Sequence, residues 1–283
     1  MTDVSCELTT QQVNDLGIEV IPMEFQMDDK SYLHYTDARM MSLDDFYARL
    51  KKGAVTKTSQ INYNTFMNYF ETYLKAGKDV LYTGISSGIS GTYNTALIAA
   101  KELQAKYPER KIIVIDSTCD SLGLALLITL AGKKYVGGAA IDELAEFIEE
   151  TKAKVCHWFV VDDLDQLKRG GRISALTTAF GKALQIKPLL SVDKTGALFN
   201  VSKIRGRNNR IPTLISRMKS DAENLKDNMI VVAYSDNPED AKEFKKAAKG
   251  LCKEVMICNL CPIIGSHVGS GLLAVSFLGK RPD

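Results

Sequence analysis

A run of hydroxyl and glycine residues is the strongest chemical signal in this chain. Residues 85–96 read Ile-Ser-Ser-Gly-Ile-Ser-Gly-Thr-Tyr-Asn-Thr-Ala. They follow an apolar segment, residues 79–85, that predicts a buried strand, and they lead into residues 92–107, whose apolar positions recur at helical spacing. Free backbone N–H groups at a helix start, together with hydroxyls, favour a bound carboxylate or phosphate. Ser90 acting only as a helix cap is the commoner alternative, because serine is a preferred capping residue.

Two further stretches have side chains suited to binding. Thr58, Ser59 and Gln60 lie between two predicted helices, in an expected loop, where their polar groups serve either a ligand or the next helix start. His267 lies in residues 264–271, Ile-Gly-Ser-His-Val-Gly-Ser-Gly, where glycines allow a ligand to approach the backbone closely. We therefore interpret His267 as a site residue. The other two histidines, His34 and His157, lie on predicted strands, where a core or sheet-face role is more common.

Positive charge is concentrated in one segment. The whole chain has a net charge of +2, yet residues 166–220 contain twelve lysines and arginines and a single acid, Asp193. Within that segment, residues 168–173 read Lys-Arg-Gly-Gly-Arg-Ile, a pattern that suits a phosphate or partner contact and is also common in surface loops. The asymmetry indicates a localised contact with something anionic. Nucleic acid is not favoured, because no binding motif or interleaved aromatic residues accompany the charge.

Composition bounds the remaining possibilities. The chain has 283 residues and no apolar stretch of membrane-spanning length, and its start lacks the features of a signal peptide. Six scattered cysteines suit reduced thiols, so we expect a cytoplasmic protein. Cys258 and Cys261 have metal or redox spacing, but a single pair favours two buried thiols at a strand end. Nothing resembles a metal cage or a dinucleotide-binding fingerprint, and we expect neither metal nor cofactor.

The predicted elements describe an α/β chain of two domains. In the first half the predicted strands are 18–27, 31–35, 79–85, 111–116 and 156–161, and the helices 42–52, 63–76 and 92–107, with two more from about residues 122 and 142. Such alternation favours a parallel sheet, whose ligands gather at the carboxyl ends of the strands. The second half predicts a hairpin, 187–192 with 197–202, then helix 206–219, strand 229–235, helix 238–250 and strand 253–259. We expect domains at 1–160 and 161–283, the second a smaller α+β unit with a mixed sheet.

Taken together, these motifs resemble those of the DegV family, bacterial fatty-acid-binding proteins. The resemblance runs nearly end to end, and its marks are Thr2-Asp3, residues 58–60, 86–93, 115–117, 163–174 and 267–271. It implies a long-chain fatty acid in a tunnel between two α/β domains, presented to a fatty acid kinase that makes acyl-phosphate for phospholipid synthesis. The carboxylate would be held by Thr58, Ser90 and His267, and Arg172 and Arg205 would lie on the face that meets the kinase or the phosphate. The implied supporting residues are Ser59, Gln60, Ser86, Ser87, Gly91, Thr92, Gly269 and Gly271.

The chain departs from the family pattern at three places. Only Met1 precedes Thr2-Asp3, whereas a full first strand is usual, so we expect that strand to be missing or stunted. Ile61 replaces the usual proline after residues 58–60, and Val268 and Ser270 replace threonine and proline after the histidine. None of these changes removes a proposed ligand group.

Burial energetics are compatible with a lipid ligand. Sequestering about a dozen methylenes at about 0.8 kcal/mol each contributes on the order of 10 kcal/mol. A buried carboxylate needs hydrogen-bond donors, which hydroxyls and an imidazole can supply. The alternative function is an acyl hydrolase or transferase with Ser90 as nucleophile and His267 as base. We favour a carrier without turnover, because the turn at Ser90 lacks the Gly-x-Ser-x-Gly pattern of a nucleophile elbow.

Overall fold

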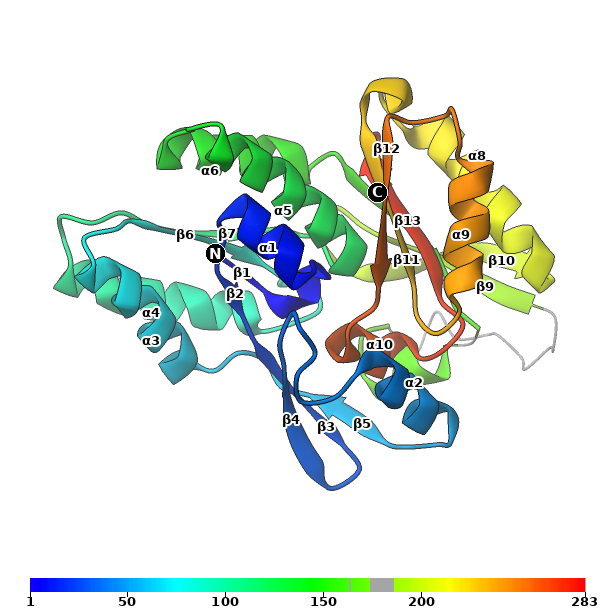
Figure 1. The fold of residues 1–283 in the computed structure, drawn as a ribbon, viewed down its shortest axis with the longest axis horizontal. Coiled ribbons are helices and arrows are strands. Elements are labelled where there is room, and N and C mark those ends of the chain that lie inside the picture. Colours follow the sequence, from blue (N-terminus) through cyan, green and yellow to red (C-terminus); the bar gives the residue numbers. More distant parts are fainter. Residues whose placement is uncertain (163, 174–185, 283) are drawn as a thin grey trace.

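A computed structural model describes residues 1–162, 164–173 and 186–282, and within them the strands form three sheet regions (Figure 1). The first is parallel. Strand β1 (Thr2–Asp3) pairs with β2 (Val20–Ile21), and β6 (Val80–Gly84) pairs with β7 (Ile112–Asp116). Main-chain bonds join the two pairs: Thr83 N donates to Met1 O at 3.1 Å and Met1 N to Leu81 O at 2.7 Å. Strand β1 is as short as the sequence predicted.

Helices flank this parallel region, and the sequence predicted each of them except the one at Thr10–Leu16. They are α1 (Thr10–Leu16), α3 (Tyr63–Lys75), α4 (Thr92–Lys106), α5 (Ser121–Val136) and α6 (Ile141–Lys152). In α3 the predicted helix 63–76 is confirmed: Asn62 caps it by accepting from Thr65 N at 2.9 Å. Phe66 and Phe70, one turn apart, are fully buried against the ring of Tyr82 on β6. Their burial fixes α3 on the sheet.

A small antiparallel sheet, in the order β4-β3-β5, lies beside the parallel one (Figure 1). Its strands are β3 (Met23–Met27), β4 (Lys30–His34) and β5 (Thr56–Thr58). Helix α2 (Leu43–Lys51), capped by Ser42, confirms the predicted helix 42–52. The expected single strand 18–27 is wrong. Pro22 separates β2 from β3, and the two halves join different sheets, because proline cannot donate to a ladder. Thr58 also differs from expectation: it ends a strand, paired with Phe25, instead of lying in a loop.

The third sheet is mixed and has six strands in the order β10-β9-β8-β13-β11-β12. They are β8 (Val155–Val160), β9 (Ile186–Val192), β10 (Leu198–Arg205), β11 (Met229–Tyr234), β12 (Glu254–Asn259) and β13 (Leu273–Leu278). The predicted placement of strand 156–161 in the first layer is wrong, because β8 pairs with β13 and β9. This sheet therefore begins at Val155, before the predicted boundary at residue 160. The two-domain division itself stays a prediction.

Helix α5 connects the two large sheets. It contacts β8, β11 and β13 on one face of the six-stranded sheet and the 3₁₀ turn Val4–Cys6 that follows β1. The other face is covered by α8 (Arg210–Asp221) and by α9 (Pro238–Ala247). Two short helices, α7 (Asp165–Arg169) and α10 (Pro262–Val268), contact each other. Short 3₁₀ turns occupy Arg207–Asn209 and Leu225–Asp227. No helix in the described ranges is long and apolar enough to cross a membrane.

Candidate functional site

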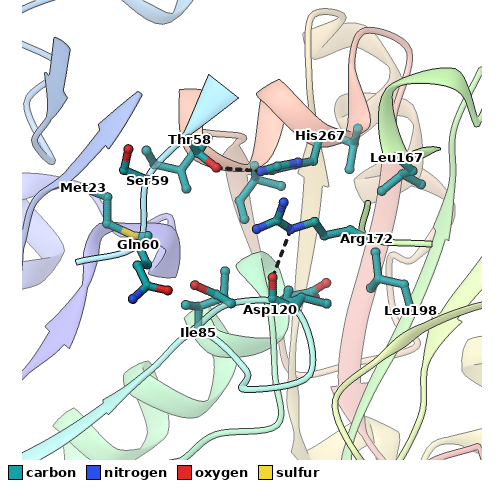
Figure 2. A pocket seen from close by; sticks show the side chains of 15 residues that line it. Met23, Thr58, Ser59, Gln60, Ile85, Asp120, Leu167, Arg172, Leu198 and His267 are labelled. Carbon is teal, nitrogen blue, oxygen red and sulfur yellow. Dashed lines mark hydrogen bonds between the residues drawn. The ribbon is translucent and has the colours of Figure 1, made fainter. Parts of the chain in front are cut away.

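Segments from all three sheet regions meet at one pocket (Figure 2). The loop after β6, the end of β5, the helix pair α7–α10 and strand β10 all contribute, together with β3 and the residue before α5. The open volume is about 50 Å³, which is room for a few water-sized groups and so for a head group but not a long tail. The lining residues are Met23, Thr58, Ser59, Gln60, Ile85, Ile89, Ser90, Asp120, Leu167, Arg172, Leu198, Ile263, Ile264, His267 and Val268.

Thr58 and His267 form the central contact of the pocket. The Thr58 Oγ1 to His267 Nε2 distance is 2.8 Å, although 209 residues separate the two in sequence (Figure 2). Strand β5 supplies the threonine and the last turn of α10 supplies the histidine. A second bond, from Thr56 Oγ1 to Ser266 O at 3.4 Å, ties the same two elements. The structure thus brings together two of the three residues that the resemblance assigns to a carboxylate.

His267 is held as a neutral ring. Burial, together with the positive charge of Arg172, lowers its pKa to about 4. Among residues 1–162, 164–173 and 186–282, its buried Nδ1 atom has no hydrogen-bond partner, and it faces Gly170, where an added Cβ would lie 2.3 Å away. With the proton on Nε2, the ring donates to Thr58 Oγ1, which leaves the threonine O–H free to donate into the pocket. In this tautomer the imidazole orients Thr58 as a donor toward the pocket, whereas with the proton on Nδ1 the threonine donates to Nε2.

Ser90 lies in the same pocket, but its own bonds stay within its loop. Its Oγ is 2.9 Å from Thr92 Oγ1 and accepts from Thr92 N at 3.3 Å. Helix α4 starts after Gly91, which makes no side-chain cap. An added Cβ on Gly91 would lie 2.1 Å from Gln60 Oε1, so glycine is needed for Gln60 to pack against the loop. Gln60 in turn donates to Thr95 Oγ1 at 3.0 Å, and this bond fixes β5's end against α4.

Some N–H groups of the loop 85–92 are bonded: Ser86 N donates to Cys119 O, Gly88 N to Ser86 Oγ, and Ile89 N and Ser90 N to Ser86 O. The expectation of free N–H groups at the helix start stays a prediction. A carboxylate does lie at this turn, but it belongs to Asp116, which accepts from both Ser87 N and Ser87 Oγ. Asp116 therefore occupies part of the turn where a ligand anion was expected.

A buried aspartate anchors the start of this loop. Asp3 is fully buried and accepts from Ile85 N at 2.8 Å, from Tyr82 OH at 2.9 Å and from Ser5. Burial raises its pKa, and these bonds act in the opposite direction. The close packing leaves no room for a side chain at residue 84, where an added Cβ would lie 2.1 Å from Asp3 Oδ2. The motif at residues 2–3 therefore holds the start of the loop after β6 in place and does not line the pocket.

Some of the implied supporting residues line the pocket, and the others hold the surrounding loops in place; we call the latter the frame residues. Ser59 and Gln60 line the pocket, whereas the others do not. Ser86 is buried and donates to Gly196 O at 2.9 Å, so it joins the loop to the β9–β10 hairpin. Gly269 ends α10 at φ 72°, a left-handed value that glycine adopts without strain. The frame residues are Ser86, Ser87, Gly91, Thr92, Gly269 and Gly271.

The two arginines assigned to a partner face lie in different places. Arg172 lines the pocket: its Nε donates to Ile89 O at 3.0 Å and its Nη1 to Gly170 O (Figure 2). Arg205 is exposed at the end of β10 and does not line the pocket. Only Arg172 can therefore place positive charge near His267 and a bound carboxylate.

Several basic residues of the segment 166–220 contact acidic or aromatic side chains of the protein itself. Arg210 is 2% exposed and its guanidinium lies 2.6 Å from a carboxylate. Several other basic residues of the segment 166–220 have internal partners as well, and Lys182 lies outside the described residues. The segment is thus less available to an outside anion than its sequence predicts. The internal partners are Asp240 for Arg207 and Arg210, Asp162 for Lys187 and the Trp158 ring for Arg217.

Sequence reasoning missed Asp120, which lines the pocket directly before α5. Burial raises its pKa to about 6, and the charge of Arg281 acts in the opposite direction. The sequence held a signal, since Asp120 follows the 115–117 motif at a strand end. No sequence feature marks the apolar residues of the pocket wall, such as Met23, Leu198 and Ile263, because in the sequence they cannot be distinguished from ordinary core residues.

The geometry does not suit nucleophilic catalysis. A serine nucleophile needs a base within hydrogen-bond reach and a group that orients the base. Here His267 bonds Thr58, Ser90 bonds Thr92, and His267 Nδ1 has no partner in the part of the chain that the structure describes. The low pKa of His267 further weakens it as a base near neutral pH. The pocket places polar side chains beside apolar ones.

Hydroxyls and an imidazole thus converge at one pocket between the α/β layers of this fold. Residues 1–280 match the family model described as "Uncharacterised protein, DegV family", and the chain belongs to the DegV family. It is 39% identical to a DegV domain-containing protein of Clostridium perfringens, covering 100% of this chain and 97% of that protein. A DegV domain-containing protein of Lactococcus lactis is 32% identical, with 99% and 97% covered.

Solved structures share the fold. A DegV lipid-binding protein from Thermotoga maritima superposes with a TM-score of 0.86 at 24% identity, covering 100% of this chain and 98% of the other. DegV from Bacillus subtilis, described as a fatty acid binding protein, has a TM-score of 0.84 at 25% identity, with 99% and 98% covered. The predicted fold class, a parallel-sheet α/β half with a mixed C-terminal sheet, is confirmed.

Proposed function

We propose that this protein binds one long-chain fatty acid, with the carboxylate held by Thr58, Ser90 and His267. The observation that most supports this proposal is the 2.8 Å distance between Thr58 Oγ1 and His267 Nε2, in a pocket that Ser90 also lines. Neighbours of the same fold that are described as fatty acid binding proteins support the ligand class.

The head group is recognised by donors of different kinds. Thr58 and Ser90 supply O–H groups, and the neutral His267 ring fixes the direction of the first. Arg172 supplies positive charge beside His267, which favours the ionised carboxylate. Charge-assisted bonds of this type are stronger than neutral ones, which compensates for the loss of water around the carboxylate.

The acyl tail needs more room than the pocket offers in this structure. Its open volume of about 50 Å³ fits the head group only. We place the tail among the apolar walls, where Ile85, Leu198 and Ile263 surround the head-group site, and their side chains must separate to admit it. About a dozen buried methylenes, on the order of 10 kcal/mol, supply the free energy for that opening.

The finer proposal is that the bound acid is presented to a fatty acid kinase, in the cytoplasm, and that this chain has no turnover of its own. The family resemblance supports it, and the exposed Arg205 is the charged group that we assign to the kinase face. The absence of an orienting partner on His267 Nδ1 fits a carrier better than a hydrolase.

Extraction of the purified protein with organic solvent, followed by mass spectrometry, tests the binding proposal. We expect one long-chain fatty acid per chain, and a rise in melting temperature when delipidated protein receives palmitate or oleate. Esters of p-nitrophenol provide the control for catalysis. Protein that carries no lipid and shows no thermal shift would contradict binding, and ester hydrolysis lost in Ser90→Ala would favour the hydrolase instead.

A further inference from the structure

Asp120 is an acidic residue in the pocket where we place a ligand carboxylate. It lines the same opening as Thr58 and His267, and its side chain is 13% exposed. Figure 2 shows it across the pocket from the Thr58–His267 pair. The open volume of about 50 Å³ has room for only a few water-sized groups, so a head group bound there lies close to the Asp120 carboxyl. The chemistry of this residue therefore affects which head groups the pocket accepts.

Asp120 directly precedes helix α5 and yet its side chain does not cap that helix. Aspartate at this position normally accepts a hydrogen bond from a main-chain N–H in the first turn. Here the side chain makes no such bond, and only the main-chain oxygen of Asp120 accepts, from Gly123 N at 2.8 Å and from Leu124 N at 3.0 Å. The carboxyl is thus directed to the pocket wall instead of to the helix.

The main chain on both sides of Asp120 is held in an uncommon conformation. Thr118 has φ 48° and Ser121 has φ 38°, left-handed values that residues other than glycine rarely adopt. Buried Arg281 donates to Thr118 Oγ1 at 3.0 Å and to Thr118 O. Ser121 Oγ donates to the buried Glu7 carboxyl at 2.9 Å. A backbone constrained on both sides fixes the direction of the side chain between them, and such strain is concentrated at functional positions.

No fixed positive charge contacts the Asp120 carboxyl in the described part of the chain. Its ion-pair partner there is His157, whose Nε2 lies 3.6 Å from Asp120 Oδ1. Burial keeps this ring neutral, because it lowers the pKa of His157 well below the usual range. The Arg281 guanidinium donates to oxygens of other residues, and its charge lowers the pKa of Asp120 only in part. Burial has the larger effect and raises that pKa to about 6.

The other ionisable groups nearby leave Asp120 without a direct counter-charge. Glu7 is itself an acid, and burial raises its pKa to about 8, with the charge of Asp120 acting in the same direction. In the pocket, His267 is neutral near pH 7, and Arg172 donates to main-chain oxygens. A ligand carboxylate therefore meets a second acid in this pocket. Two carboxyl groups at close range in a buried site do not both ionise, because their like charges repel strongly there.

We propose that Asp120 selects the head group by holding a proton: it donates a hydrogen bond to the ligand carboxylate, and the two carboxyl groups together carry one negative charge. Binding an ionised fatty acid then transfers one proton from solvent to Asp120, while the ligand stays ionised beside Arg172. This role of Asp120 rests on the proposed function, because it requires a carboxylate in the pocket. A fatty alcohol needs no added proton, since its hydroxyl donates to the ionised Asp120. A long-chain amine is the competing head group, and the positive charge of Arg172 disfavours it.

Two variants isolate Asp120 in binding measurements between pH 6.5 and pH 8.5. Asp120→Asn keeps the size and a donor but carries no charge, and Glu7→Gln is the matched control because Glu7 also titrates in this range. Since the bound carboxylate raises the pKa of Asp120 further, delipidated wild type should bind a fluorescent fatty acid more weakly as the pH rises, by at most about tenfold per pH unit. Asp120→Asn should bind equally across the range, and about tenfold or more tighter than wild type at pH 8.5. Glu7→Gln should keep the wild-type profile.

Two further measurements separate a proton-holding role from a structural one. The corresponding fluorescent alcohol should bind wild type without weakening as the pH rises, which requires no variant to fold. Oleate added in weak buffer at pH 7.5 should cause the uptake of about one proton more per bound ligand with wild type than with Asp120→Asn.

Four outcomes would overturn the role of Asp120. They are acid binding by wild type that does not change with pH, equal proton uptake by wild type and Asp120→Asn, a pH dependence that Glu7→Gln abolishes, and tighter binding of a long-chain amine than of the acid. Wild type that binds neither the acid nor the alcohol would contradict the proposed function itself. Acid binding that is independent of pH would contradict only the role of Asp120.

Discussion

Replacing Thr58 with valine isolates the central contact of the head-group pocket. Valine keeps the shape of the side chain and its place on β5, but it removes the hydroxyl 2.8 Å from His267 Nε2. Because His267 Nδ1 already lacks a partner, the variant leaves both ring nitrogens unsatisfied. The ligand carboxylate loses a donor at the same time. Each loss is of the kind that costs about 1–3 kcal/mol in a buried setting.

Converted to affinity, that range corresponds to about 5- to 150-fold weaker fatty acid binding. Titration of delipidated protein with a fluorescent fatty acid measures the change. Thr56→Val is the matched control, since Thr56 lies on the same strand, bonds Ser266 O and does not line the pocket. Thr58→Ser, which keeps the hydroxyl, should bind close to wild type. The reasoning is refuted if Thr58→Val binds within about twofold of the Thr56→Val protein.

Three other predictions concern the same pocket. Ser90→Ala should weaken fatty acid binding by about 1–3 kcal/mol in the same titration, whereas Ser87→Ala, which loses only an exposed bond to Asp116, should not. The pKa of His267 is about 4 in the folded protein, below its usual 6.5. Between these two values the unfolded chain binds a proton that the folded protein does not, so the stability of the fold is highest above pH 6.5 and declines as the pH falls toward 4. We expect the free energy of unfolding, measured with denaturant, to fall in wild type relative to His267→Gln between pH 6.5 and pH 4, by at most about 1.4 kcal/mol per pH unit. If the free energies of unfolding of the two proteins had the same pH dependence, the prediction would be contradicted. Arg172→Glu should weaken lipid binding, because it places a negative charge beside the bound carboxylate. Arg205→Glu should leave lipid binding intact and slow acyl-phosphate formation by a kinase. If instead Arg205→Glu weakened lipid binding and Arg172→Glu slowed the kinase step, the two assignments would be exchanged.

The sequence alone determined most of the local structure, because local interactions encode it. Ser42 caps the helix predicted at 42–52, Asn62 caps the helix predicted at 63–76, and the apolar spacing of Phe66 and Phe70 sets the buried face of α3. The hydroxyl-rich loop after β6 and the glycine-flanked His267 were both recognisable as site candidates from residue types.

Tertiary structure decided how these pieces combine. Strand β8 has an apolar sequence that suits either large sheet, and only its pairing with β13 and β9 assigns it to the second. Asp116 binds Ser87 at the loop where a ligand anion was expected, an outcome that depends on β6 and β7 lying side by side. Thr58 meets His267 across 209 residues because β5 and α10 pack together, and no periodicity along the chain encodes a contact between elements so far apart.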